Sequence, residues 1–490
     1  MTRTSSAAYR NESLPGLPAF QAAPTRPAEW VIHEFAQAAL PDRRHRRRLH
    51  LIATAFAQKP TASIPQACGR LAEVKAAYRF VENEAIVPAM IRQSHHQATV
   101  QRLGAHPIIL AVQDTTVLNY TTHPGTEGLG PVCHTRRNIG LLLHSTLAIT
   151  PAGQPLGFLH NAVRARGRHR RVCSRERRPL ADKESYKWVE SLSACQAVAP
   201  QCPDTMLVNI TDREGDLYEL FVQALGAPEA NRVELLVRAR HDRKLAEGSA
   251  TLWQQVAHQR VAATLQVRVG RRGDHPSRVA SLSIRFCEVQ LKAPKRKAEQ
   301  PPLRLWAIQA REIHPPKGTA RIVWQLLTTL PVTSVAEAIE RVRWYAQRWQ
   351  IEVIHKVLKS GCQIEQRQME TAQRLERALS IDLVVAWRIL ALCKAARELP
   401  DDPISDWLPA AQWQTLWCYV HQRPTVPRNS PSVRQAVRWI AQLGGFLARK
   451  SDGEPGTTTL WRGLQELEAM TKMWEVCHAP KRRQKDVGNA

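Results

Sequence analysis

The sequence lacks the signals of a membrane, secreted or zinc-stabilised protein. It has no run of about 18 apolar residues, the length that a membrane-spanning helix needs. The N-terminus, beginning Met1-Thr2-Arg3, carries no apolar core of the signal-peptide kind. None of the 10 cysteines forms a C-x-x-C pair, and no histidine stands beside them at the spacing of a zinc site. We therefore expect reduced cysteines, no structural zinc and no membrane-spanning segment.

Acidic residues are scarce relative to basic ones. The chain has 43 Asp and Glu against 69 Lys and Arg, a formal net charge of +26. So basic a chain repels itself unless a polyanion neutralises it. Nucleic acid is the first candidate partner. An anionic membrane surface is the alternative, although no amphipathic helix stands out to favour it.

The 490 residues allow two or three domains, and a hydrophobic content of 43% is enough for globular cores. A leader rich in Pro, Ser and Ala (1–27) precedes a basic region with helical periodicity (28–100). Short apolar runs and helices alternate in 101–375, which predicts an α/β domain. Within it, alternating residues at about 240–332 predict an antiparallel β insertion. The stretch 376–490 reads as helical and ends in a basic tail.

Two aspartates follow apolar runs that we interpret as buried strands. Asp114 comes after the run 108–112, and Asp212 comes after the run 206–210. Ligand sites in open α/β sheets gather beyond the ends of such strands. Two carboxylates brought together there repel each other, and a divalent cation removes that penalty. The alternative is that each aspartate only begins a turn.

A long helix is expected from about 334 to 359. At about 100° per residue, one acidic residue, three basic residues and a phenol fall within roughly 80° of arc, with apolar residues opposite. These five are Tyr345, Arg348, Glu352, Lys356 and Lys359. A solvated helix face with ion pairs one turn apart is one interpretation. A phosphate backbone held beside a metal ligand is the other.

The pattern Tyr345-x2-Arg348-x3-Glu352-x6-Lys359 resembles the signature of the insertion-sequence-four family of bacterial DDE transposases. The resemblance extends over most of the chain from about residue 28, and includes the stretches 113–116, 211–214 and 443–446. It implies an RNase H-like catalytic core with an antiparallel β insertion, flanked by N-terminal and C-terminal helical regions.

The resemblance also implies an activity and a site. Asp114, Asp212 and Glu352 would be the catalytic, metal-binding triad of a cut-and-paste DNA transposase. The expected cofactor is Mg²⁺, which Mn²⁺ can replace, and the expected chemistry is two-metal phosphoryl transfer. The enzyme would bind the inverted repeats at transposon ends, cut there and join the ends to target DNA.

Further residues would contact double-stranded DNA. Tyr345, Arg348, Lys356 and Lys359 match residues that grip phosphates near the cleaved end. Trp324 matches a tryptophan that stacks on a flipped base; the alternative is an ordinary strand residue packed in the core. Additional candidates are Arg213, Arg43 and Arg44.

The same resemblance assigns a role to each end of the chain. The N-terminal region would read the end sequence, and the C-terminal helices would pair two subunits in a homodimeric synaptic complex. We expect the protein at the nucleoid, in the bacterial cytoplasm.

Two other functions remain open at this point. A non-catalytic DNA-binding protein would keep the basic regions without needing the three acidic residues. A different RNase H-like nuclease would cut DNA without joining it.

Overall fold

A computed structural model of the chain describes residues 27–132, 137–167, 179–269 and 278–478. Its centre is one mixed sheet in the order β2-β3-β1-β5-β6-β10-β9-β8-β7, with β4 also paired to β3. The strands of this sheet are β1 (Ile108–Asn119), β2 (Gly130–Pro131), β3 (Ile139–Ile149), β4 (Pro155–Arg164), β5 (Met206–Thr211), β6 (Glu234–Arg238), β7 (Ala263–Val269), β8 (Arg278–Leu291), β9 (Leu303–Glu312) and β10 (Val323–Thr328).

Strand β1 lies in the middle of the sheet and is buried on both faces at its start. Leu110 and Val112 point into the core shared with α10 and α11, and Ile109 and Ala111 point into the core shared with α6 and α7. Each fully buried side chain of this kind contributes about 1.5–3 kcal/mol. The apolar run was therefore correctly interpreted as a central strand.

The expected end of this strand was wrong. The parallel pairing of β1 with β5 stops at Val112 and Ile210, but the antiparallel pairing with β3 continues to Asn119 and Gly140. Asp114 therefore lies inside β1, opposite Ser145, and just beyond the stretch that β5 covers. A long-range partner extends the strand after its apolar run has ended.

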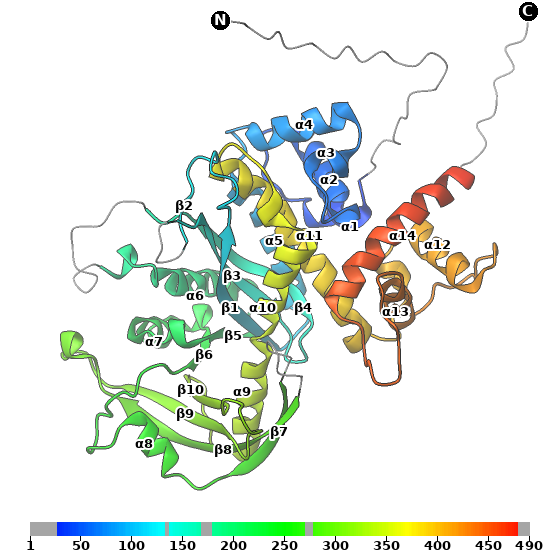
Figure 1. Cartoon of the computed structure of the whole chain (residues 1–490). Coiled ribbons are helices and arrows are strands. Elements are labelled where there is room, and N and C mark those ends of the chain that lie inside the picture. The colour runs from blue at the N-terminus through cyan, green and yellow to red at the C-terminus, as the bar shows by residue number, and fades with distance from the viewer. Residues whose placement is uncertain (1–26, 133–136, 168–178, 270–277, 479–490) are drawn as a thin grey trace, which may run out of the picture.

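Strands β7 to β10 continue the central sheet. Each pairs antiparallel with the next, and β10 pairs antiparallel with β6, placing Leu327 opposite Val237. The strands form the lower half of the sheet in Figure 1, where α8 (Leu252–Ala257) packs on them. The alternating segment predicted at 240–332 is thus antiparallel but shares the sheet with β1, β5 and β6.

Helices cover both faces of the sheet (Figure 1). One face carries α6 (Tyr186–Val198) and α7 (Tyr218–Leu225). The other carries α9 (Val335–Gln347), α10 (Gln350–Lys356) and part of α11 (Ala372–Glu398).

The expected continuous helix from 334 to 359 was wrong in detail. Helix α9 begins with a capping box between Ser334 and Glu337 and ends at Gln347. Residues 348 and 349 form a turn before α10 starts. A π-helical segment, Val357–Gly361, follows α10 directly. Because of the break and the π-helical segment, the side chains around Glu352 point in directions different from those they would have on one straight α-helix.

The N-terminal region is helical, as its periodicity predicts. Its helices are α1 (Glu29–Glu34), α2 (Arg43–Gln58), α3 (Ile64–Cys68), α4 (Leu71–Glu82) and α5 (Pro88–Leu103). Asp42 caps α2 by accepting a hydrogen bond from the backbone N–H of His45 at 2.9 Å. The predicted leader, 1–27, lies almost wholly outside the described residues.

A third core lies in the C-terminal region, where α12 (Ala410–His421), α13 (Val433–Leu443) and α14 (Thr457–Cys477) pack on the end of α11. The proposed boundary between 375 and 376 falls within α11, which contributes to both this core and the main one. Among the described residues, no helix has the length and apolar character required to span a bilayer.

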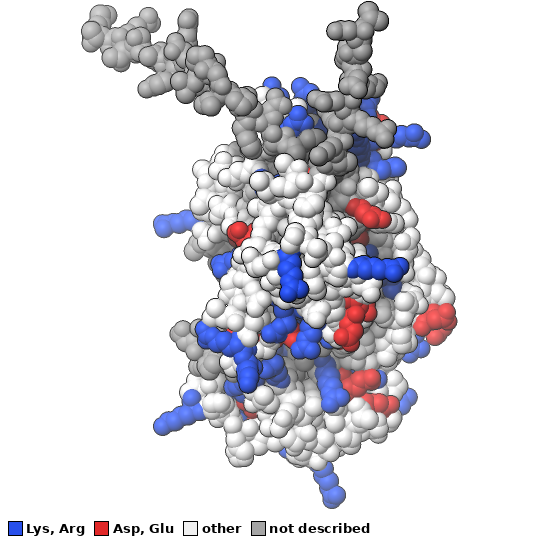
Figure 2. Space-filling view, turned by 90° about the vertical axis from the view of Figure 1, so that its right-hand side faces the viewer, with Lys and Arg blue, Asp and Glu red and all other residues white. Residues whose placement is uncertain are grey.

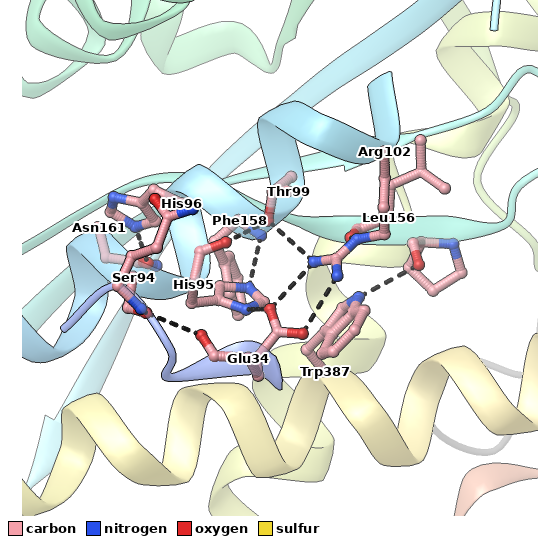
Figure 3. Close-up of polar contacts among 12 residues, drawn as sticks. Glu34, Ser94, His95, His96, Thr99, Arg102, Leu156, Phe158, Asn161 and Trp387 are labelled. Atoms are coloured by element: carbon pink, nitrogen blue, oxygen red, sulfur yellow. Dashed lines mark hydrogen bonds and ion pairs between the residues drawn. The ribbon is translucent and has the colours of Figure 1, made fainter. Parts of the chain in front are cut away.

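A buried polar cluster joins α1 to α5 and β4 (Figure 3). Glu34 accepts hydrogen bonds from His95 and from Arg102, whose Nη1 and Nη2 lie 3.1 and 3.0 Å from its carboxylate oxygens. The backbone N–H of Phe158 donates to His95 Nε2 at 3.0 Å, so the proton of this imidazole is on Nδ1, facing Glu34. Arg102 also stacks 4.5 Å over the ring of Trp387 in α11.

The cluster favours an ionised Glu34. Burial raises the pKa of Glu34, but the charges and hydrogen bonds of His95 and Arg102 outweigh it and lower the pKa to about 2. Three segments far apart in sequence are therefore held together by one buried carboxylate.

Candidate active site

Asp114 is placed by the part of β1 that extends beyond β5. Its Oδ1 accepts a hydrogen bond from the backbone N–H of Thr115 at 2.7 Å. Because side chains alternate along a strand, Asp114 points to the same face as Leu110 and Val112, the face that α10 covers.

Asp212 follows the last residue of β5, as predicted. It caps a short 3-10 helix, Arg213–Gly215, by accepting a hydrogen bond from the backbone N–H of Glu214 at 2.8 Å. This bond leaves the second carboxylate oxygen for another partner. Because β1 and β5 are parallel neighbours, Asp114 and Asp212 lie toward the same end of the sheet.

Glu352 lies in the first turn of α10, and Arg348 lies at the turn between α9 and α10. Arg348 donates from Nη1 to Asp114 Oδ2 at 3.2 Å, and from Nη2 to Glu352 Oε1. One guanidinium therefore joins a strand residue to a helix residue. The alternative of a fully solvated helix face does not describe Arg348, whose side chain is largely buried.

The electrostatics connect all three acidic residues. Burial raises the pKa of Asp114. The positive charge of Arg348 and the hydrogen bond from the Thr115 N–H lower this pKa, whereas the negative charges of Asp212 and Glu352 raise it. The result is a pKa of about 6. Burial lowers the pKa of Arg348, but Tyr345, Asp114 and Glu352 outweigh this and raise it above its usual value. Asp114 is thus held near carboxylates that repel its ionised form.

The described residues include no group of three His, Cys, Asp or Glu side chains arranged closely enough to hold a metal ion. Arg348 lies between Asp114 and Glu352, and supplies positive charge where these two carboxylates meet. By donor chemistry, three carboxylates fit a hard divalent cation such as Mg²⁺. Binding such a cation to all three residues requires them to move closer together than they are here.

Two of the predicted DNA-contacting aromatic residues pack against each other. The rings of Trp324 and Tyr345 are edge to face, with centroids 5.1 Å apart. Tyr345 is only 4% exposed, so it belongs to the core and does not share the polar helix face on which its spacing had placed it with Arg348 and Lys356. The direction of the Tyr345 side chain follows from its packing against Trp324 of β10, a long-range contact that a helical wheel cannot reveal. Trp324 is half-buried.

The predicted basic residues fall into two groups. Lys359 lies in the π-helical segment, with Nζ 3.6 Å from Glu365 Oε1. Lys356 and Arg213 are exposed beside the acidic residues. Arg43 and Arg44 are exposed in the first turn of α2, in a different part of the molecule. Figure 2 shows one face of the molecule on which Lys and Arg side chains are widely spread, with acidic side chains mainly toward its right edge.

One polar residue beside the site was not predicted. His144 in β3 is buried and contacts both chain neighbours of Asp114. It lies in an apolar run, 141–149, whose composition indicates a strand and nothing more, and its contacts depend on the β1–β3 register. Sequence spacing offers no signal for them.

Three family models match different parts of the chain. A transposase DNA-binding model matches residues 27–86, a transposase DDE domain model matches 218–387, and a model of the Tn5 transposase dimerisation domain matches 384–477. The chain belongs to the Tn5-like DDE transposases. The resemblance found from the sequence motifs is therefore confirmed.

One solved structure similar to this transposase is a piggyBac transposase synaptic complex with hairpin DNA, seen by cryo-electron microscopy. The sequence identity is 10% and the TM-score 0.33, and the match covers 96% of this chain and 77% of the other. At that TM-score, the likeness adds nothing to the assignment of individual residues. The family models carry the identification.

Proposed function

We propose that this transposase works by cut and paste: it binds the inverted repeats at transposon ends, cuts them, and joins them to target DNA. The supporting observation is that Arg348 bridges Asp114 in β1 and Glu352 in α10, while Asp212 follows β5 toward the same end of the sheet. Burial raises the pKa of Asp114, and the negative charges of Asp212 and Glu352 add to this by repelling its ionised form. A fold maintains such repulsion mainly where function uses it.

Asp114, Asp212 and Glu352 would hold divalent cations, Mg²⁺ or in its place Mn²⁺. When bound, the cations would activate the attacking oxygen and stabilise the leaving oxygen of a phosphodiester. The chain itself supplies the placement of the carboxylates: β1 and β5 carry the two aspartates toward one end of the sheet, and the α9–α10 turn holds Arg348 between Asp114 and Glu352. This catalytic region would be an RNase H-like core, formed by β4-β3-β1-β5-β6, with β7 to β10 as its β insertion.

Cationic and aromatic side chains beside the acidic residues would hold the DNA. Lys356 and Arg213 are exposed and free to meet phosphates, and Lys359 would exchange its contact with Glu365 for one. Arg348 would neutralise the carboxylates before cations bind, and contact a phosphate afterwards. Tyr345 would support Trp324, whose partly exposed ring is suited to stacking on an unpaired base.

The two ends of the chain would bind the transposon end and a second subunit. Arg43 and Arg44 project from α2 within the DNA-binding match, so this helix would contact the end sequence. The C-terminal helices match a dimerisation domain, so they would pair two subunits in the synaptic complex.

The test uses the full chain, Mg²⁺ and a DNA fragment that carries the sequences flanking the gene. We expect cleavage at the transposon ends and joining of those ends to a second DNA. Asp114→Asn is the matched control, because it preserves size and removes the charge, and should bind the ends without cutting. Cleavage by Asp114→Asn at the rate of the unmodified protein would overturn the assignment. Cutting without joining would instead indicate a nuclease.

A further inference from the structure

A single buried histidine contacts the residues on both sides of Asp114. His144 lies opposite Thr115 in the β1–β3 register. Its Nδ1 is 2.9 Å from the hydroxyl oxygen of Thr115, and its Nε2 is 2.9 Å from Oε1 of Gln113. These contacts lie on the α6 face of the sheet, opposite the face to which Asp114 points.

The hydrogen bonds determine the protonation of this imidazole. Gln113 donates from Nε2 to Asn209 Oδ1, so its Oε1 faces His144 as an acceptor. Nε2 of His144 therefore carries the proton, and Nδ1 accepts from the Thr115 hydroxyl. Burial and nearby cations lower the pKa of His144 well below its usual value, which agrees with a neutral ring.

The resulting chain of hydrogen bonds joins three strands where one backbone ladder ends. The β1–β5 ladder stops at Val112 and Ile210, two residues before Asp114. At this end of the ladder, the side chain of Gln113, the first residue of β1 after it, binds His144 in β3 and Asn209, which lies within the ladder in β5. The side chains therefore tie β1 to both of its neighbouring strands at the point where its backbone pairing with β5 stops and its pairing with β3 continues.

His144 itself has little freedom to move. It is 2% exposed, and the ring of Trp188 from α6 packs edge to face against it with centroids 4.8 Å apart. Close packing of this kind holds a side chain in one rotamer. The imidazole is therefore a fixed reference point for Gln113 and Thr115.

We propose that His144 is a positioning residue that sets the direction of the Asp114 carboxylate by fixing the backbone on both sides of it. This inference rests on the proposed function, in which Asp114 holds a catalytic cation. An error of about 1 Å in the position of a catalytic group can lower a rate about 100-fold. The His144 contacts would limit such an error from the α6 face of the sheet, opposite the face to which Asp114 points.

The test compares three variants of the full chain. His144→Phe keeps a flat ring against Trp188 but removes both hydrogen bonds. His144→Gln keeps one donor and one acceptor. His160→Phe is the matched control, because His160 lies in the neighbouring strand β4 and is partly buried, and the structure records no bond from it to Gln113 or Thr115 among the described residues.

Single-turnover cleavage of end DNA is measured with the Kd for that DNA and the Mg²⁺ concentration that gives half the maximal rate. We expect His144→Phe to cleave about 10- to 100-fold more slowly, with an unchanged Kd and a raised Mg²⁺ requirement. A loss of folded protein alone would lower the amplitude without changing the Mg²⁺ requirement. His144→Gln should recover most of the rate, and His160→Phe should match the unmodified protein.

Two smaller changes keep the test decisive if His144→Phe does not fold. Thr115→Val and Gln113→Leu each remove one of the two bonds and should each slow cleavage, with a smaller effect than His144→Phe. Unchanged rates in both variants would overturn the inference, as would a folded His144→Phe that cleaves within about twofold of the unmodified rate, a difference of about 0.4 kcal/mol.

The failure of this inference is distinguishable from the failure of the proposed function. If Asp114→Asn is inactive but the His144, Thr115 and Gln113 variants cleave normally, only the positioning role is wrong. If Asp114→Asn cleaves normally, the proposed function is wrong, and the positioning role with it.

Discussion

Nη1 of Arg348 lies 3.2 Å from Oδ2 of Asp114, across 234 residues of sequence. The same guanidinium binds Glu352 one helical turn further along the chain. An arginine between two carboxylates offsets the repulsion between them. Arg348 and a divalent cation would therefore compete for the same carboxylate oxygens.

This competition predicts the behaviour of Arg348 variants. Without metal, Arg348→Gln should lower the free energy of unfolding by about 1–3 kcal/mol, less than for a fully buried pair because Glu352 is partly exposed. The free energy of unfolding of Arg348→Lys should lie between those of Arg348→Gln and the unmodified protein, since an ammonium group cannot bridge both acidic residues as a planar guanidinium does.

Mg²⁺ should raise the Tm of Arg348→Gln more than that of the unmodified protein, because the freed carboxylates bind the cation more tightly. Thermal unfolding with EDTA and with Mg²⁺ measures both effects. An equal Tm rise in the two proteins would contradict the competition.

Asp114→Asn should stabilise the metal-free protein at pH 7.5. Folding raises the pKa of Asp114 from 3.8 to about 6, so its ionised form is less favourable in the folded state. The penalty is full above about pH 6, shrinks as the pH falls and is absent below 3.8. A pKa shift of this size corresponds to a gain in stability of up to about 3 kcal/mol for Asp114→Asn. The loss of the ion pair between Asp114 and Arg348 reduces this gain.

The measurement is urea unfolding in EDTA at several pH values. The stability advantage of Asp114→Asn should disappear between pH 6 and 4. An asparagine variant that is less stable than the unmodified protein at pH 7.5 would show that the ion pair with Arg348 outweighs the repulsion.

Local patterns were sufficient to predict which strands and which helix carry the three acidic residues. The apolar runs before Asp114 and Asp212 are buried strands, and Glu352 is on a helix that packs over them. Buried parallel strands produce such runs because both faces are covered. The carboxyl ends of parallel neighbours meet at one end of a sheet, so the two aspartates could be placed together.

Long-range contacts determined what the sequence did not reveal. Strand β1 continues to Asn119 because β3 pairs with it. The helix breaks at Arg348 although neither glycine nor proline lies there, and Tyr345 is buried because Trp324 of β10 packs on it. The contacts of His144 require the exact register of two strands, which periodicity does not determine.

Glu34 gives a pH dependence of the opposite sign. Folding lowers its pKa from 4.5 to about 2, so its contribution is fully present above pH 4.5 and is lost as the pH falls toward 2. The shift corresponds to about 3 kcal/mol. Glu34→Gln should therefore lower the free energy of unfolding by about this amount at pH 7. Its stability should also decrease less than that of the unmodified protein as the pH falls from 4.5 toward 2.

Urea unfolding between pH 2.5 and 7 measures the Glu34 effect. Glu29→Gln is the matched control, since Glu29 lies on the same helix and is exposed. A Glu34→Gln protein that matches the control at both ends of the range would show that the buried cluster contributes no net stability.

Arg43 and Arg44 should contribute to the salt dependence of binding to transposon ends. Each phosphate neutralised by a protein contributes about −0.9 to the slope of log Kobs against log salt concentration. Arg43→Ala with Arg44→Ala should therefore reduce the size of the slope by about 1.8. Arg304→Ala is the control, because this exposed guanidinium already pairs with Glu288. An unchanged slope in the double variant would remove α2 from the DNA contact.

The last turns of α14 should form part of the subunit contact. Met473 and Val476 are 65% and 71% exposed, lie one turn apart and fall within the match to the dimerisation domain. Exposed apolar side chains on one helix face are stabilised when a second copy covers them. Met473→Asp and Val476→Asp should therefore weaken pairing without affecting the core beneath.

A gel-shift assay with one labelled end separates the two steps. Both aspartate variants should retain the complex of one protein with one end and lose the paired complex that contains two ends. Glu475→Ala, a change at an exposed polar residue of the same turn, should keep both complexes. Loss of the single-end complex as well would mean that the substitutions disturb DNA binding, and a normal paired complex would place the contact elsewhere on the C-terminal helices.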